Sequence, residues 1–268
     1  MTFGTRGVSV DFGAVPALRE VSIAVPPGEV TAVVGGDGAG KSTLLRCLVG
    51  QVIPHIGDVD RPPKQQVGYM SFSSGTWRDL SVYENVEFVG GVYGLSGNAL
   101  RQRRDELLSR AGLDQVGHRL AGQLSGGMRQ KLGFVLAMLH SPALLVLDEP
   151  STGVDPVSRV ELWRMIAGAA AGGTAVLMST TYLDEAERAS SLLVLDGGRV
   201  VLSGVPDAVI AATPGTIVRT SRPTVPTRAW RRGRTFHEWL PEGSTDGGQI
   251  VDPDLEDAII VEMIGAGR

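Results

Sequence analysis

The sequence is poor in the residues that build disulfides and metal sites. Its 268 residues include one cysteine, Cys47, and four histidines. A lone cysteine excludes an internal disulfide and a metal cage built from several cysteines. The histidines are scattered and do not have the spacing of metal ligands. We therefore expect the fold to be stabilised by its apolar core, which a chain of this length is long enough to bury.

Long apolar runs are missing as well. The run around Phe134–Leu139 is much shorter than the roughly 18–20 residues that span a bilayer. The first residues, MTFGTRGVSV, do not join a basic region to an apolar one, so we expect no signal peptide. The formal net charge of −4 argues against general nucleic-acid binding. These features predict a chain with no membrane span and no nucleic-acid partner.

Hydrophobic patterns predict strands that alternate with helices. Alternating apolar and polar residues predict half-buried strands at Val8–Phe12 and Val21–Val25. Residues 79–139 are predicted to be mostly helical. Such alternation is typical of a parallel sheet covered by helices on both faces. The remaining predicted elements are buried strands at Val30–Val34, Ala143–Leu147 and Thr174–Ser179, helices from near Lys41, over Pro156–Ala171 and over Tyr182–Ala189, and a hairpin around Asp196–Arg199.

The composition changes after about Thr213. Residues 219–234 contain six arginines and no acid, and proline, glycine and threonine are frequent there. This predicts a small β-rich module that closes with the segment Leu255–Ile264. The arginines indicate either a surface for anionic headgroups or a solvated face with local ion pairs, and we favour the second.

Glycine is abundant, with 36 residues, and one glycine-rich segment follows the predicted strand Val30–Val34. Gly35-Gly-Asp-Gly-Ala-Gly-Lys-Ser42 fits the pattern G-x-x-x-x-G-K-[ST], and a predicted helix begins at its end. Glycines let backbone N–H groups surround an anion, and the start of the helix adds partial positive charge. The lysine reaches the β- and γ-phosphates of a nucleotide, and the serine holds Mg²⁺. The predicted nucleotide-binding residues are Gly35, Gly36, Asp37, Gly38, Ala39, Gly40, Lys41, Ser42 and Thr43.

Two carboxylates follow another buried strand. Leu144-Leu-Val-Leu147 delivers Asp148 at its carboxyl end, where ligands bind in open α/β sheets. Asp148 suits Mg²⁺ through water, so Ser42 and Asp148 are the predicted metal site. Glu149 can act as general base on an attacking water.

A third segment, Leu124-Ser-Gly-Gly-Met-Arg-Gln130, places Ser-Gly-Gly at the start of a predicted helix. Together the three motifs make the chain resemble the nucleotide-binding subunit of ABC transporters over about residues 6–210 and again in the last dozen. The resemblance implies an α/β architecture, the ABC type of P-loop NTPase fold. It has a RecA-like core, an N-terminal antiparallel β subdomain, a helical subdomain at about 79–139 and a small C-terminal appendage. The predicted domains are the ABC ATPase domain, 1–212, and the appended module, 213–268.

The resemblance also implies that two such subunits dimerise head to tail. Ser125, Gly126 and Gly127 of one subunit then close over the ATP held by the other. Phe12 occupies the place of the aromatic residue that stacks on adenine, although a plain strand-core role is an alternative. Asp155 matches the loop that crosses the dimer interface.

The segments Tyr182–Glu187 and Leu255–Asp257 resemble the branch of the family that serves ABC-2 type exporters of drugs, antibiotics and lipid-linked products. Members of this branch keep ATPase and permease on separate chains. The expected partners are therefore an integral membrane permease and a second ABC ATPase subunit. The expected location is the cytoplasmic face of the cell membrane, as a peripheral protein.

Two positions depart from the family pattern. Phe72 stands where glutamine helps to ligate Mg²⁺ and position water, and Thr181 stands where histidine bonds to the γ-phosphate. Phenyl can do neither polar task, and a threonine hydroxyl is shorter than imidazole. Ser73 or Ser74 is a candidate for partly replacing the amide. Losing one such group commonly costs about 10²–10³-fold in rate, so we expect the hydrolytic site to be weak. Its candidate catalytic residues are Glu149 and Thr181.

We therefore expect a subunit that couples ATP binding and hydrolysis to efflux, as the degenerate half of a heterodimer. A slow homodimeric transport ATPase is one alternative. A non-hydrolytic, nucleotide-gated regulatory subunit is another, although Glu149 speaks against it. A DNA-maintenance ATPase is discarded, because only about 80 residues separate the phosphate loop from the Ser-Gly-Gly helix and no long heptad run lies between them.

Overall fold

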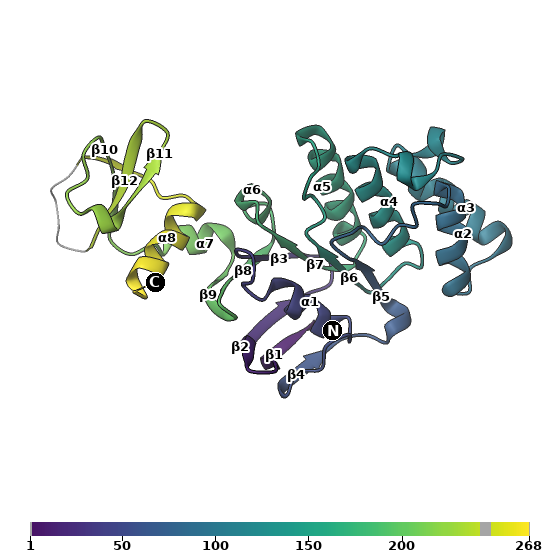
Figure 1. The fold of residues 1–268 in the computed structure, drawn as a ribbon, viewed down its shortest axis with the longest axis horizontal. Coiled ribbons are helices and arrows are strands. Elements are labelled where there is room, and N and C mark those ends of the chain that lie inside the picture. The colour runs from purple at the N-terminus through teal and green to yellow at the C-terminus, as the bar shows by residue number, and fades with distance from the viewer. Residues whose placement is uncertain (1, 242–247, 268) are drawn as a thin grey trace.

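The centre of the protein is a six-stranded sheet (Figure 1). The structure is a computed structural model that describes residues 2–241 and 248–267. In order across the sheet, the strands are β5 (Val67–Met70), β6 (Leu144–Asp148), β7 (Ala175–Thr180), β3 (Val30–Val34), β8 (Ser191–Asp196) and β9 (Arg199–Gly204). The first five strands are parallel, and β9 pairs antiparallel with β8, as the predicted hairpin requires. The carboxyl ends of β6, β7 and β3 are therefore neighbours.

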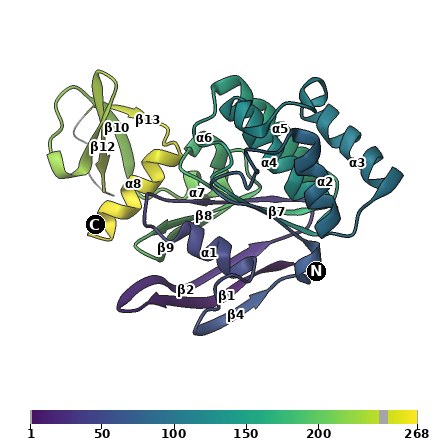
Figure 2. The same cartoon turned by 45° about the vertical axis from the view of Figure 1, so that its right-hand side comes forward.

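A smaller antiparallel sheet faces one side of the central sheet. It consists of β2 (Val15–Val25), β1 (Phe3–Phe12) and β4 (Ile56–Asp60). Helix α1 (Lys41–Leu48) lies between the two sheets (Figures 1 and 2). Its leucines Leu44, Leu45 and Leu48 are fully buried in that layer, which confirms the predicted apolar face. This packing fixes the start of α1 against the sheet.

Four longer helices lie on the other side of the central sheet (Figure 2). They are α2 (Val82–Val92), α3 (Gly97–Arg110), α4 (Gly126–Met138) and α5 (Pro156–Ala171). Buried residues of α4, such as Leu132 and Val135, join Leu145 and Leu147 of β6 in one apolar cluster. Helix α5 has the predicted bounds and carries proline in its first turn, where the missing N–H costs nothing.

The C-terminal segment forms its own antiparallel sheet. Its strands are β11 (Ala229–Arg232), β12 (Thr235–Leu240), β10 (Thr216–Thr220) and β13 (Gln249–Val251). The chain then returns as α8 (Leu255–Gly265), which packs beside α7 (Pro206–Ala211) (Figure 1). Leu255 and Ala258 of α8 belong to the apolar cluster of the main body. The boundary at 212/213 stays a prediction, and residues 242–247 and 268 of the predicted module lie outside the described residues.

The arginine-rich stretch divides between solvent and local ion pairs. Arg232 forms ion pairs with Asp254 and with Glu256, the latter at 2.6 Å. Arg228 lies over the ring of Trp239 at 5.8 Å from its centroid. The other four arginines are exposed: Arg219, Arg222, Arg231 and Arg234.

The helix predicted over Tyr182–Ala189 is shorter in the structure. Helix α6 spans only Leu183–Ala186. The chain turns back because the N–H of Ser190 donates to the carbonyl of Val30 at 2.8 Å, which starts the pairing of β8 with β3. The prediction of a longer helix was therefore wrong at its C-terminal end.

Candidate functional site

The glycine-rich loop lies between the carboxyl end of β3 and the first turn of α1. Gly40 is the residue before the helix and has a φ of 105°. A Cβ atom there would lie 2.7 Å from the carbonyl oxygen of Ala17. A Cβ atom at Gly35 would lie 2.4 Å from the carbonyl oxygen of Leu195. The loop therefore follows a path that only glycine permits at these two positions.

Lys41 is held at the centre of this loop. Its side chain is buried, and its Nζ donates to the carbonyl oxygens of Gly35 at 2.7 Å and Gly36 at 3.1 Å. The same Nζ forms an ion pair with Oε1 of Glu149 at 3.1 Å. One ammonium group thus joins the phosphate loop to the end of β6.

Asp148 lies at the carboxyl end of β6 and is buried. Its Oδ1 accepts hydrogen bonds from Ser42 Oγ at 3.1 Å and from Ser179 Oγ at 2.8 Å. In the register of the sheet Asp148 stands directly opposite Ser179 of β7. The structure thus brings together both predicted metal ligands, and it adds Ser179, which the sequence analysis did not single out.

The donor set at Ser42 and Asp148 fits Mg²⁺. A hydroxyl and a carboxylate are the hard oxygen ligands that this ion prefers, and it commonly takes only one or two ligands from the protein. Within residues 2–241 and 248–267 no group of three or more His, Cys, Asp or Glu side chains is placed to hold a metal ion. A magnesium ion here would take its further ligands from water and from the phosphates of a nucleotide.

Glu149 adopts a strained backbone conformation. Its φ is 49°, a left-handed value that costs a residue with a side chain on the order of 1–3 kcal/mol. The surroundings hold it there: its N–H donates to Ser179 Oγ at 2.9 Å, and its Oε2 accepts from Thr152 Oγ1 at 3.0 Å. The carboxylate is thereby turned toward Lys41. Its role as a general base stays a prediction.

The loop that carries Phe72 follows β5 and lies on α4. Phe72 is exposed over 58% of its surface. Ser74 is buried, with a φ of 64°, and its Oγ donates to the carbonyl of Ser73 at 2.6 Å and bonds to Thr76 Oγ1 at 3.1 Å. Ser73 Oγ bonds to Ser71 Oγ at 3.2 Å. Both serines therefore use their hydroxyls within the loop.

Thr181 is exposed just beyond β7, and the neighbouring Thr180 is buried. Thr180 Oγ1 donates to Oε2 of Glu185 at 2.6 Å, and that oxygen also accepts from Ser151 Oγ at 2.9 Å. Arg159 lies 3.4 Å from the other oxygen of Glu185. This buried carboxylate links the loops after β6 and β7. No sequence pattern indicates this role of Glu185, because its partners are distant in the chain.

The Ser-Gly-Gly segment caps α4. Ser125 Oγ accepts a hydrogen bond from the N–H of Met128 at 3.2 Å, and Ser125 and Gly126 are exposed. A Cβ atom at Gly127 would lie 2.6 Å from Ser158 of α5. The helix start thus packs tightly against α5 and still presents its exposed end to solvent.

Asp155 caps α5 beside this surface. Its Oδ1 accepts from the N–H groups of Ser158 at 3.0 Å and Val157 at 3.1 Å. These hydrogen bonds, with that from Ser158 the largest, lower the pKa of the Asp155 carboxyl. The exposed residues on this face remain predicted interface residues.

Phe12 lies at the end of β1 and is 53% exposed. The strand-core alternative for this residue was therefore wrong. An exposed ring is available for stacking, which stays a prediction.

A glycine-rich loop between strand and helix, with Lys41 and Asp148 beside it, defines a P-loop NTPase. A family model described as "ABC transporter" matches residues 18–152. The chain belongs to the ABC transporter family, and its α/β fold is the ABC type of P-loop NTPase fold.

The chain is similar to several exporter proteins. It is 39% identical over 210 residues to "Probable multidrug ABC transporter ATP-binding protein YbhF" of Escherichia coli, which covers 75% of this chain and 36% of that protein. It is 36% identical over 220 residues to "Daunorubicin resistance ATP-binding protein DrrA3" of Streptomyces coeruleorubidus, covering 78% of this chain and 70% of that protein. The matched part thus spans about a third of YbhF.

Solved structures of ABC transporter subunits have the same fold. "Structure of ATP binding subunit of ABC transporter" matches 79% of this chain and 92% of that chain, with a TM-score of 0.71 and 28% identity. The structure of cbiO1 from Clostridium perfringens matches 78% of this chain and 90% of that chain, with a TM-score of 0.71 and 25% identity. In the described part of this chain, no helix is both long enough and apolar enough to cross a membrane.

Proposed function

We propose that this chain is the ATP-binding subunit of an export complex and couples ATP binding and hydrolysis to efflux through a separate membrane permease. The similar proteins are named for multidrug transport, daunorubicin resistance and Nod factor export. Those names support a drug, antibiotic or lipid-like substrate. The subunit would lie on the cytoplasmic face of the membrane as a peripheral protein.

ATP binding rests on the phosphate loop. Lys41 directs its donors at two loop carbonyls and at Glu149, and phosphate oxygens of ATP compete for the same donors. Ser42 and Asp148 would hold Mg²⁺, which neutralises phosphate charge when bound. Glu149 would then accept the proton of the attacking water.

One observation supports a degenerate site. Lys41 pairs with Glu149, and Asp148 accepts a hydrogen bond from Ser42. The two side chains that would complete the site are Phe72, an exposed ring, and Thr181, a short hydroxyl. Ser73 and Ser74 use their hydroxyls within their own loop, so neither replaces the missing amide. We therefore place this chain as the degenerate half of a heterodimer with a second ABC ATPase.

An exposed aromatic patch supports a permease partner. It consists of Trp77 and Phe88, which are both exposed and pack edge to face with ring centroids 4.5 Å apart. Exposed aromatic clusters mark interaction surfaces more often than free solvent faces. This patch is the proposed contact with the permease.

The alternatives are the slow homodimer and the non-hydrolytic regulatory subunit. An experiment on the complex, purified from its own cells through a tag on this chain, distinguishes these alternatives from the heterodimer. We expect Gly126→Asp, which places like charge where the partner's γ-phosphate would bind, to abolish transport and ATPase activity. Ser125→Arg, which adds bulk there, should do the same. Glu149→Gln should only reduce both activities, because the partner's site stays complete. Gly265→Asp, at the exposed last residue of α8 with open space around its Cβ, is the matched control.

The outcomes are distinct. Equal severity of Glu149→Gln and Gly126→Asp would show that this chain has a working hydrolytic site and would favour the homodimer. No effect of Glu149→Gln on a complex with only this ATPase chain would favour the regulatory subunit.

A further inference from the structure

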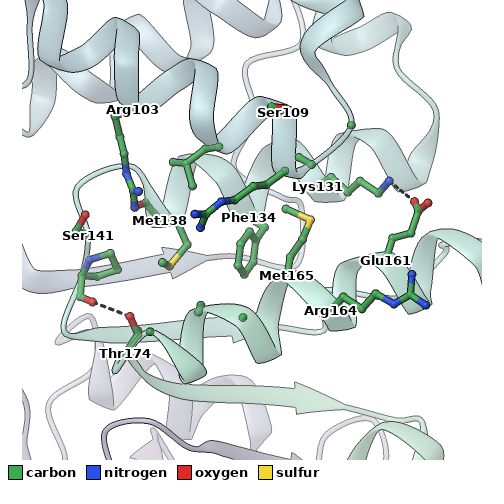
Figure 3. Close-up of a pocket in the computed structure, with 18 of the residues that line it drawn as sticks. Arg103, Ser109, Lys131, Phe134, Met138, Ser141, Glu161, Arg164, Met165 and Thr174 are labelled. Atoms are coloured by element: carbon green, nitrogen blue, oxygen red, sulfur yellow. Dashed lines mark hydrogen bonds and ion pairs between the residues drawn. The ribbon is translucent and has the colours of Figure 1, made fainter.

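A cleft of about 830 Å³ opens between α3, α4 and α5 (Figure 3). Ser141 and Pro142, which precede β6, and Thr174, which precedes β7, close one side of it. These residues lie at the amino ends of the strands. The nucleotide site lies at the carboxyl ends, so this α3–α5 cleft is a separate place in the fold.

The cleft exists because small residues face it. Ala111, Gly168, Ala169, Gly172 and Gly173 line part of it, and longer side chains form the rest of its walls. Gly168 lies within helix α5, and a Cβ atom there would meet no atom within 4 Å. The sequence therefore keeps open a space that an ordinary helix-forming residue at 168 would reduce.

The middle of the cleft is apolar. Phe134 and Met138 of α4 and Met165 of α5 point into it between its two ends (Figure 3). Thioether side chains adapt to the shape of an apolar partner. A volume of this size is within the roughly 300–1,000 Å³ range of small-molecule sites.

The charge of the lining is positive. Arg103, Arg110, Lys131 and Arg164 line the cleft together with one acid, Glu161. At one end Arg103 donates to the carbonyls of Leu139 at 3.4 Å and Met138 at 3.2 Å and pairs with Glu106. Arg110 also pairs with Glu106.

At the other end Lys131 pairs with Glu161, and Arg164 stands beside them (Figure 3). Among the described residues Arg164 has no hydrogen-bond or ion-pair partner, so this end keeps one uncompensated cation.

We propose that the α3–α5 cleft binds a small amphipathic organic anion, a carboxylate or sulfonate with an apolar body. The body lies against Phe134, Met138 and Met165, and the acid group lies at the end formed by Lys131 and Arg164. The occupant is a small molecule because the cleft has the volume of a small-molecule site and combines an apolar middle with cations at its ends. The proposal does not depend on the transport function.

The test uses the full chain and the probe 8-anilinonaphthalene-1-sulfonate, with laurate as a competitor. Saturating Mg·ATP is present so that the probe cannot occupy the nucleotide site. We expect one probe per chain, displaced by laurate. Gly168→Leu should weaken probe binding by at least about tenfold, because the side chain takes up the space of the probe. Gly168→Ala is the matched control and should change it by less than about threefold.

Arg164→Glu tests the charged end. It should weaken binding by about three- to tenfold, and more at low salt. Arg222→Glu, at an exposed arginine in the connection between β10 and β11, makes the same charge change outside the cleft and should have no effect. Equal binding by wild type, Gly168→Leu and Arg164→Glu would overturn the proposal. So would the absence of saturable binding, which would leave a macromolecular occupant as the explanation of the cleft.

Discussion

Restoring the two missing polar side chains should convert a weak ATPase site into an active one. Phe72→Gln and Thr181→His supply the amide and the imidazole that the family places there. Both positions are exposed, Phe72 over 58% of its surface. The substitutions therefore remove no core packing, and the fold should tolerate them.

The expected gain in kcat depends on whether hydroxyls near these two positions are free to replace the missing groups. Ser74 is buried and bonded to Ser73 and Thr76, and Thr180 is bonded to Glu185. None of these groups is free to act on a phosphate or a water. One positioned acid–base partner or charge-stabilising donor is worth about 10²–10³-fold in rate. We therefore expect the double variant to exceed wild-type kcat by about 10²–10³-fold and to exceed either single variant, because both groups act on one water and one phosphate.

The assay is steady-state phosphate release by the purified chain at saturating Mg·ATP. Lys41→Ala in the restored background is the control, because it should abolish the gain and so exclude a contaminating ATPase. The Thr181→His variants should also gain a pH dependence near the ordinary histidine pKa of about 6.5. A wild-type rate already within the usual range of about 1–10³ s⁻¹ would refute the degenerate-site argument. So would a double variant no faster than wild type.

Two further predictions concern backbone and titration. Gly40→Ala, at a φ of 105° with its Cβ 2.7 Å from the carbonyl of Ala17, should cost about 1–3 kcal/mol of stability and most Mg·ATP affinity. Gly91→Ala, in α2 with open space around its Cβ, should lower neither the stability nor the affinity measured by calorimetry. Equal losses in the two variants would contradict the loop geometry. Burial lowers the pKa of His140, so its neutral form favours the folded state, and this contribution is lost as pH falls below about 6.5. In urea titrations, His140→Phe should therefore lose less free energy of unfolding than wild type between pH 7 and pH 5. An equal loss in the two proteins would argue against this role of His140.

Much of the fold was predictable from local patterns. The strand Val30–Val34 and the helix Pro156–Ala171 have the bounds that their apolar patterns and the proline indicate. Helix α6 was overestimated, because the pairing of β8 with β3 ends it and no local signal encodes that pairing. For the same reason, the return of α8 onto α7 was not predicted in detail.

Part of the site was predictable from the sequence, and part was not. Lys41, Ser42, Asp148 and Glu149 were predicted from spacing and strand ends, and the structure brings them together. Ser179 was not singled out, since its role at Asp148 arises from strand register and not from a sequence pattern. The left-handed backbone of Glu149 was also invisible in the sequence, because a glutamate there gives no sign of its φ angle.

The last prediction concerns how the C-terminal sheet is joined to the rest of the protein. Asp257 of α8 is fully buried and accepts hydrogen bonds from Trp230 Nε1 at 3.1 Å and the N–H of Asp254 at 3.1 Å. His237 Nδ1 lies 2.9 Å from its carboxylate, and Arg232 lies 3.7 Å away. One carboxylate thus connects two strands of the C-terminal sheet to a helix that packs on the main body.

Asp257→Ala removes this connection and leaves several polar groups unpaired. Breaking a buried charged pair by removing one partner costs about 3–5 kcal/mol. We expect that cost to fall on the C-terminal sheet, because α8 keeps Leu255 and Ala258 in the apolar cluster of the main body. Limited proteolysis should therefore cut within 213–251 much faster than in wild type, while Mg·ATP affinity stays within about twofold. Glu256→Ala, which removes a half-exposed partner of Arg232, is the control and should change the cleavage rate little. If ATP affinity fell together with protease resistance, the C-terminal sheet and the nucleotide site would be one cooperative unit. The prediction that the C-terminal sheet loosens independently of the nucleotide site would then be wrong.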